Sequence, residues 1–206
     1  MAGREARIER AGDGVNAWIV GDDDEVIVID PGADAIDGTD VLRVVGDREV
    51  LAVICTHGHR AHAAAALQVA ERDEAQIALH PADRLAWREV HGGRAPEIDM
   101  EDGGEFDVAG AVLEVIHAAG HSPGSVCLYC EDLGVVFAGD VLSEAGPVPH
   151  DGAFPDFPAQ VSAIGERVLT LPPATRVLCG HGDELTVREA ERRFDSWVSA
   201  GPASQP

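Results

Sequence analysis

The stretch CTHGHRAH, residues 55–62, carries three histidines within six positions, His57, His59 and His62. Imidazole nitrogens are common ligands of zinc and other transition metals. An HxH pair alone is weak evidence, because such a pair can also lie in a solvent-exposed loop. The chemistry of this stretch therefore depends on whether further ligands from distant parts of the chain gather around it.

Three other segments repeat one local pattern, in which an apolar run is followed by glycine and then by a residue that can bind metal. They are AAGHSPGS with His121, FAGDVL with Asp140 and LCGHGDE with His181. Neighbouring strands of a layered sheet end at one edge, where sites of α/β proteins tend to form. The sequence therefore predicts one site built from His57, His59, His62, His121, Asp140 and His181. Such nitrogen and oxygen donors suit zinc, iron or manganese better than calcium or magnesium.

Strands that alternate with helices would position these residues. Short apolar runs bounded by turn residues predict strands, and longer stretches without breakers predict helices. The predicted strands include two hairpins, at 16–32 and 125–140, and the buried strand EVLAVICTH at 49–57. The predicted helices are residues 38–47, 61–73, 81–90, 157–171 and 186–198. This order indicates an α/β layered fold.

The simplest organisation is one domain over residues 1–206, with a core of about 5–198 and a frayed end at 201–206. The Gly/Pro-rich segment 143–156 is long enough to suggest a functional loop. His150 within this loop is a candidate for contact with the substrate.

The charge of the chain restricts its partners. There are 37 acidic residues against 15 basic ones, all of them arginine, for a net charge of −22. A field of that sign repels phosphate backbones and anionic membrane surfaces, so we expect no nucleic-acid or membrane partner. We expect a small-molecule substrate instead. No apolar run approaches the about 20 residues of a membrane span, and no secretory signal is visible, so a cytoplasmic location is expected. The sequence does not specify an oligomeric state.

The cysteines suggest no second site. Cys127 and Cys130 have the CxxC spacing but lie in predicted strands, and no second CxxC is present to complete a zinc site. We predict that they are buried, unreactive strand residues.

The order THxHxxH, GHSPGS, GD and GH, preceded by VIVIDPG, resembles the metallo-β-lactamase-fold superfamily and most closely its glyoxalase II-like (hydroxyacylglutathione hydrolase-like) branch. The likeness extends from about Asn16 to about Glu191. It implies a four-layer αββα sandwich, with two mixed β-sheets face to face, helices outside and metal at one edge. It also implies a first metal on His57, His59 and His121, a bridging Asp140, and a second metal completed by His62 and His181. Asp30 would orient the ligand loop by hydrogen bonds.

One position departs from the family motif HxHxDH, whose aspartate is a ligand of the second metal. This chain has Ala61 there. In one interpretation, only the three-histidine site binds metal, with an open fourth position for water. In the other, His62, Asp140 and His181 hold a second metal more weakly. We favour the first, and expect one tightly bound zinc and a second that is weak or absent, with iron or manganese as alternatives.

The resemblance implies a metal-dependent hydrolase of a small ester, thioester or lactone. The metal would lower the pKa of bound water to about 7, supply hydroxide and polarise the carbonyl. Asp140 would bind metal or accept a proton, and His62 or His181 would act as the base. Members that cleave glutathione thioesters carry a basic helical extension, whereas one predicted helix follows His181 in this sequence. A glutathione thioester is therefore disfavoured as the substrate, although the short branch of the family remains open.

Two alternatives remain open. A mononuclear non-haem iron oxidoreductase like the persulfide dioxygenases would use His57, His121 and Asp140. A degenerate member would bind a ligand without turnover.

Overall fold

The computed structural model describes residues 5–12, 14–32, 38–150 and 155–202, and its strands form two six-stranded sheets. The first contains β1 (Arg7–Ala11), β2 (Ala17–Gly21), β3 (Glu25–Ile29), β4 (Glu49–Ile54), β5 (Gln76–Leu79) and β6 (Ile98–Asp99), in that spatial order. The second runs through β12 (Leu185–Thr186), β11 (Arg176–Cys179), β10 (Val135–Gly139), β9 (Val126–Cys130), β8 (Ala111–His117) and β7 (Glu105–Val108). Both sheets mix parallel and antiparallel pairs.

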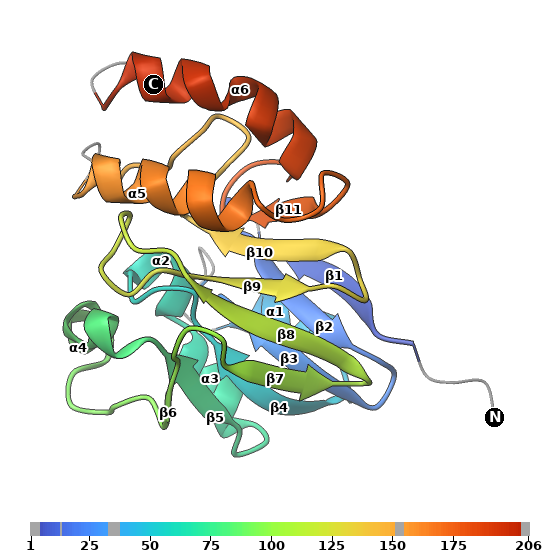
Figure 1. Ribbon diagram of the computed structural model, residues 1–206. Coiled ribbons are helices and arrows are strands. Elements are labelled where there is room, and N and C mark those ends of the chain that lie inside the picture. Colours follow the sequence, from blue (N-terminus) through green and yellow to red (C-terminus); the bar gives the residue numbers. More distant parts are fainter. Residues whose placement is uncertain (1–4, 13, 33–37, 151–154, 203–206) are drawn as a thin grey trace.

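Helices cover the outer face of each sheet (Figure 1). On the first sheet these are α1 (Thr39–Val45), α2 (Arg60–Ala63), α3 (Ala66–Glu71) and α4 (Arg84–His91), the last preceded by the 3₁₀ turn η1 (Pro81–Asp83). On the second they are α5 (Phe157–Ala163), its π-helical continuation η2 (Ile164–Val168) and α6 (Val187–Ala200). The predicted αββα sandwich is confirmed.

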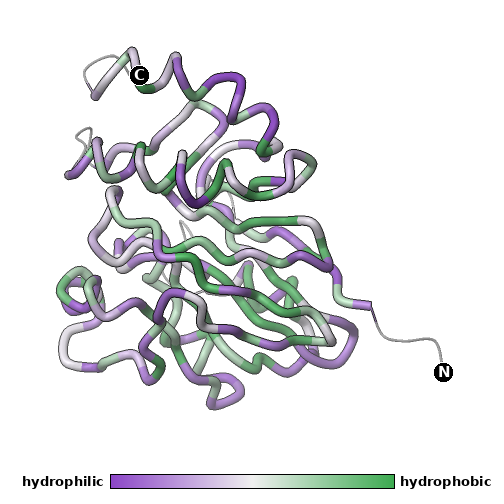
Figure 2. The backbone as a smooth tube through the Cα atoms, viewed as in Figure 1, coloured by the Kyte–Doolittle hydropathy of each residue, from purple (hydrophilic) through white to green (hydrophobic). Residues whose placement is uncertain are grey.

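The strand sequences explain this layering. In β3, Ile27 and Ile29 face the core between the sheets, whereas Val26 and Val28 face the helices. Successive side chains of a strand point to opposite faces, so a strand covered on both sides needs a continuous apolar run. Figure 2 shows hydrophobic colour along the central strands of both sheets.

The two sheets are joined by backbone hydrogen bonds at one edge. The Val126 N–H donates to the Thr56 carbonyl at 2.9 Å, and the Asn16 N–H donates to the Gly180 carbonyl at 2.8 Å. Both distances are typical of backbone hydrogen bonds. Both bonds lie beside the carboxyl ends of β4 and β11. At the edge that carries the predicted ligands, the two sheets are therefore held to each other by backbone hydrogen bonds.

The helix predicted at 61–73 is divided in the structure into α2 and α3. In an unbroken helix, the carbonyls of His62 and Ala63 would accept from amides one turn later. Here the Gly32 N–H donates to the His62 carbonyl at 2.8 Å, and the His91 ring lies 2.8 Å from the Ala63 carbonyl. External partners thus occupy the two carbonyls at the break, which is a recognised cause of helix interruption. The helix predicted at 157–171 is likewise replaced by α5 and η2, ending at Val168.

The interpretation of the cysteines is confirmed. All four, Cys55, Cys127, Cys130 and Cys179, are buried and free. Cys127 packs beneath the helices and Cys130 packs between the sheets, so the two thiols of the CxxC lie on opposite faces of β9.

Some expectations fall partly outside the described residues. Of the loop 143–156, residues 151–154 lie outside them, and so do residues 203–206 of the expected frayed end. Within the described ranges, no helix has the length and apolar character needed to cross a membrane.

Candidate metal centre

Each predicted ligand follows a strand at the joined edge. His57 comes three residues after β4, Asp140 directly follows β10, and His181 comes two residues after β11. His121 lies in the loop between β8 and β9. The structure therefore brings together all six residues that the sequence pattern selected.

The residues directly before Asp140 and His181 are glycines because the backbone there passes too close to neighbouring side chains to carry a Cβ. Gly139 has φ 48°, in the left-handed region, and an added Cβ would lie 2.3 Å from the Thr56 hydroxyl. A Cβ on Gly180 would lie 2.6 Å from an Asp140 oxygen and from the His62 ring. These glycines let the strand ends approach the cluster as closely as they do.

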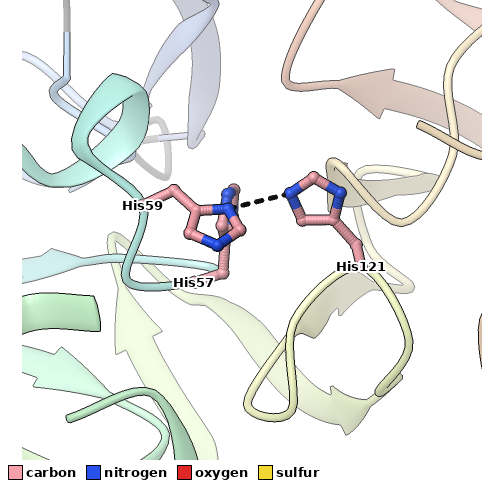
Figure 3. A group of neighbouring side chains, drawn as sticks. All are labelled: His57, His59 and His121. Atoms are coloured by element: carbon pink, nitrogen blue, oxygen red, sulfur yellow. Dashed lines mark hydrogen bonds between the residues drawn. The ribbon is translucent and has the colours of Figure 1, made fainter. Parts of the chain in front are cut away.

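The first cluster consists of His57, His59 and His121, whose rings face one another (Figure 3). One nitrogen from each ring lies within 4.8 Å of the others, and His59 Nδ1 is 3.0 Å from His121 Nε2. His57 Nε2 is buried and has no hydrogen-bond partner. A buried polar atom without a partner is costly, and a metal ion at this point would satisfy it.

The protonation states of this cluster favour metal binding. Burial, followed by the neighbouring histidines, lowers the pKa of His57 well below its usual range. Burial and His121 lower the pKa of His59 to about 4, and burial also lowers that of His121. All three rings are thus neutral near pH 7, the form that binds a metal. His121 Nδ1 donates to the Val148 carbonyl at 3.0 Å, which leaves the Nε2 lone pair facing the cluster.

The second cluster consists of His62, Asp140 and His181. His181 Nδ1 lies 2.7 Å from Asp140 Oδ1, and His62 Nε2 lies 3.2 Å from Asp140 Oδ2 without hydrogen-bond geometry. The same Asp140 Oδ2 lies 3.6 Å from His121 Nε2. Asp140 therefore stands between the two clusters, as a bridging ligand would.

Charge in the second cluster differs from that in the first. Burial alone would lower the pKa of His62, but Asp140 and Asp30 together raise it to about 10. Burial alone would raise the pKa of Asp140, but His62 and His181 hold it well below its usual range. In the metal-free protein, a proton on His62 thus provides positive charge that a metal would otherwise supply.

Asp30 lies where the resemblance placed it, behind the ligands. Its Oδ1 accepts from the Thr56 N–H at 2.7 Å, and its Oδ2 accepts from the Thr56 hydroxyl at 2.7 Å and from His62 Nδ1 at 3.0 Å. Because that hydroxyl donates to Asp30, it accepts from His57 Nδ1, 3.2 Å away. Asp30 thereby orients the rings of both His57 and His62 so that their Nε2 atoms face the clusters.

A cavity of about 870 Å³ opens onto both clusters. Ala61 lines it beside His62 and His181, so the second cluster offers three protein donors. His150 also lines the cavity, with its ring stacked on His59 at a centroid distance of 3.6 Å and an angle of 11°. The loop residue suggested as a substrate contact is therefore at the cavity wall.

Sequence reasoning missed two buried polar residues that hold the ligand loops, Asp83 and Gln160. Gln160 Nε2 donates to the carbonyls of Asp140, Val141 and Val148, at 3.2, 3.0 and 3.1 Å. Asp83 lies in the turn η1 and Gln160 in the helix α5, and neither is preceded by an apolar run and a glycine, so the pattern that found the ligands could not find them.

The remaining histidines lie away from the clusters. His80 and His117 stack on each other at 4.2 Å and belong to neither cluster. His91 is half-buried, because its ring packs against Trp87 at 4.1 Å and contacts the Ala63 carbonyl.

Comparison with known proteins gives a family match over most of the chain. The sequence model of the metallo-beta-lactamase superfamily matches residues 10–181. A probable metallo-hydrolase of Bacillus subtilis (strain 168), YqgX, is 32% identical over 186 residues, covering 84% of this chain and 87% of that protein. The hydroxyacylglutathione hydrolase GloC of Haemophilus influenzae is 25% identical over 191 residues, covering 86% and 90%.

A similar solved structure is that of TTHA1623 in a di-iron-bound form. It is 30% identical, with a TM-score of 0.71, and the match covers 86% of this chain and 92% of that one.

Proposed function

The chain belongs to the metallo-beta-lactamase superfamily, and on that premise we propose that it is a metal-dependent hydrolase of a small ester, thioester or lactone. The observation that carries the proposal is the convergence of the neutral His57, His59 and His121 rings beneath an open cavity. The names of two relatives, a probable metallo-hydrolase and a hydroxyacylglutathione hydrolase, support a hydrolytic reaction at a carbonyl group.

In this proposal, His57, His59 and His121 would hold the tightly bound metal, with the Asp140 carboxylate as a further donor beside them. When bound, a divalent metal supplies an acidified water and a Lewis acid for the substrate carbonyl. Asp30 keeps the ring nitrogens of His57 and His62 directed at the clusters through its contacts with Thr56 and His62. We infer zinc as the metal, because three histidines and an open position are the usual set for catalytic zinc.

Of the two candidate bases, His181 is the better placed. Its side chain is 39% exposed and lines the cavity, and Asp140 holds its Nδ1. His62 has no exposed surface, and its two nitrogens face Asp30 and Asp140. We therefore assign His181 to accept the proton from the attacking water, and His62 to hold Asp140 in position.

The cavity wall indicates what the substrate resembles. Ala61, Ala64, Ala86 and Val90 give it an apolar side. Arg60 is the cavity's arginine, and within the described part of the chain its guanidinium makes no hydrogen bond or ion pair. We infer a small acyl substrate with an apolar portion and one anionic group within reach of Arg60.

A second candidate is an iron-dependent oxidoreductase of the persulfide dioxygenase type. His57, His121 and Asp140 form the two-histidine, one-carboxylate set that it would need, and a relative has been solved in a di-iron-bound form. Iron in the purified protein with oxygen uptake on adding a persulfide would support this reaction, and zinc alone without uptake would exclude it.

The proposal is tested by acid release from a panel of small thioesters, lactones and esters. Protein with a measured zinc content should release acid from at least one class, and chelator-stripped protein should not. If zinc-loaded protein releases no acid from any member, the hydrolase proposal is wrong, and the iron-dependent oxidoreductase and a non-catalytic binding role are the candidates that remain.

A further inference from the structure

We propose that Asp83 is a positioning residue that fixes the two ligand loops of the first cluster relative to each other. His57 and His59 lie on the loop after β4, whereas His121 lies on the loop between β8 and β9 of the other sheet. Their mutual geometry therefore depends on what joins the two loops. The inference rests on the proposed function only in taking these three histidines as metal ligands.

The carboxylate of Asp83 binds both loops at once. Its Oδ2 accepts from the Gly58 N–H at 2.8 Å, between the two histidines of the first loop. The same oxygen accepts from the Ser122 hydroxyl at 2.6 Å, directly after His121. Its Oδ1 accepts from the Gly124 N–H at 2.6 Å, further along that second loop.

The hydrogen bonds of Asp83 are strengthened by its burial, because water does not compete for its carboxylate. Asp83 is 1% exposed, and the described ion pairs include no arginine partner for it. Its charge is balanced by donors from the two loops, and hydrogen bonds to an ionised acceptor are roughly twice as strong as neutral ones. Losing one of them would leave a buried polar group unsatisfied, so the loops are held firmly where they are.

The packing around Asp83 leaves no space for a side chain at the two glycines that contact it. An added Cβ on Gly58 would lie 2.8 Å from the Asp83 carbonyl oxygen, and one on Gly124 would lie 2.7 Å from Asp83 Oδ1. Both loops thus touch Asp83 through glycine backbone. The helix that begins beside it, α4, is itself fixed at its far end by the contact of His91 with the Ala63 carbonyl.

This helix also forms part of the cavity wall, through Ala86 and Val90. One short segment therefore positions the metal ligands through Asp83 and lines the space where substrate would bind. We infer that the separation of His59 Nδ1 and His121 Nε2, 3.0 Å here, is set by this segment as well as by the two sheets.

The test is metal binding by Asp83→Asn, which keeps the shape but presents an amide N–H to at least one loop donor. Asp99→Asn is the matched control, because it removes one charge from an exposed carboxylate that pairs with Arg84. Zinc affinity is measured by competition with a chelator, and coordination geometry by the visible spectrum of the cobalt-substituted protein. We expect Asp83→Asn to bind zinc about 10- to 100-fold more weakly, with an altered cobalt spectrum, and Asp99→Asn to match wild type.

Wild-type affinity and an unchanged cobalt spectrum in Asp83→Asn would overturn the positioning role. If Asp83→Asn does not fold, Ser122→Ala decides the matter, since it removes one of the three donors from the opposite side. That variant should show a smaller loss of zinc affinity, and wild-type affinity in it would equally contradict the proposal. A wild-type chain that binds neither zinc nor cobalt would instead overturn the proposed function, and with it the assignment of Asp83.

Discussion

The side chain at position 61 sets how many protein donors surround the second cluster. Ala61 contributes a methyl group to the cavity beside His62 and His181, and Asp140 is shared with the first cluster. The first cluster has three neutral histidines of its own. This difference is the physical basis for expecting one tightly bound metal.

Ala61→Asp should therefore raise the metal-to-protein ratio from about one to about two. The new carboxylate would join His62, Asp140 and His181 and supply an oxygen donor at a distance of ~2.0–2.2 Å from zinc. Equilibrium dialysis against zinc measures the ratio. Ala64→Asp, which puts the same charge elsewhere on the cavity wall, should stay near one. Two firmly bound metals in wild type would show that Ala61 does not weaken the second site.

The depressed pKa values of the first cluster predict how the metal-free protein responds to pH. His57, His59 and His121 have folded pKa values below 6.5, so the unfolded chain binds more protons in acid and stability falls as pH drops from 6.5. The contribution of His59 to the stability of the folded protein is lost as the pH falls from 6.5 to about 4. His62 has the opposite sign, since its pKa is raised to about 10, so its contribution is present below 6.5 and is lost between 6.5 and 10.

Urea unfolding of the metal-free protein at pH 5, 6.5 and 9 checks this expectation. Stability should be greatest near pH 6.5. His59→Gln should reduce the loss between pH 6.5 and 5 while leaving the loss toward pH 9 unchanged. An acid limb that is identical in wild type and His59→Gln would contradict the assignment.

At the scale of elements, the glycine before Asp140 connects strand geometry to the site. Gly139→Ala should lower the free energy of unfolding by about 1–3 kcal/mol, because the backbone at this residue is left-handed. The added Cβ would also clash with the Thr56 hydroxyl, which donates to Asp30, and this clash should lower the free energy of unfolding further. Gly134→Ala is the matched control, with φ 61° and no atom within 4 Å of an added Cβ. Urea unfolding and zinc binding of both variants measure the effect. Only Gly139→Ala should weaken zinc binding, and equal behaviour of the two variants would contradict the role assigned to the close approach.

The strands and the ligands were predictable because both follow local rules. The hairpins of β2 with β3 and of β9 with β10 have continuous apolar runs around turn residues, and each runs close to a predicted ligand or to Asp30. A glycine followed by a histidine or aspartate at a strand end is a local signal that repeats along the chain. The family resemblance then supplied the grouping into two clusters.

What could not be predicted depends on partners far away in the sequence. The division into α2 and α3 arises from Gly32 and His91, which take the carbonyls of His62 and Ala63. Asp83 bonds to residues 25 and 41 positions away. The short strands β6 and β12, of two residues each, carry too little pattern to be recognised. These features are set by tertiary contacts rather than by local propensity.

At the scale of the whole molecule, the net charge of −22 surrounds a site that would bind a cation. Such a field repels large polyanions and attracts divalent metal ions, and salt screens it over about 10 Å at 0.1 M ionic strength. A small anionic substrate can still bind where Arg60 and the metal dominate locally. The charge of the chain is therefore a reason to expect a small substrate rather than a polyanionic polymer.

Arg60→Gln should raise the KM for a monoanionic ester about tenfold, because it removes one charge-assisted contact worth roughly 1.5 kcal/mol. The same substitution should leave the KM for a neutral ester nearly unchanged. Arg88→Gln, an exposed arginine outside this cavity, controls for the change in net charge. Steady-state kinetics on the two esters separate the effects. Equal changes for the anionic and neutral esters would argue against a role of Arg60 in substrate recognition.

The most direct test of the central claim is acid release by chelator-stripped protein as zinc is added back, measured together with bound zinc. We expect hydrolysis of a panel ester, thioester or lactone to rise in proportion to bound zinc and to reach most of its maximum at about one zinc per chain. His121→Ala, which removes one of the three histidines, should bind zinc far more weakly and remain inactive at the same zinc concentration. Hydrolysis that is independent of zinc, or that survives in His121→Ala at wild-type zinc affinity, would contradict the account.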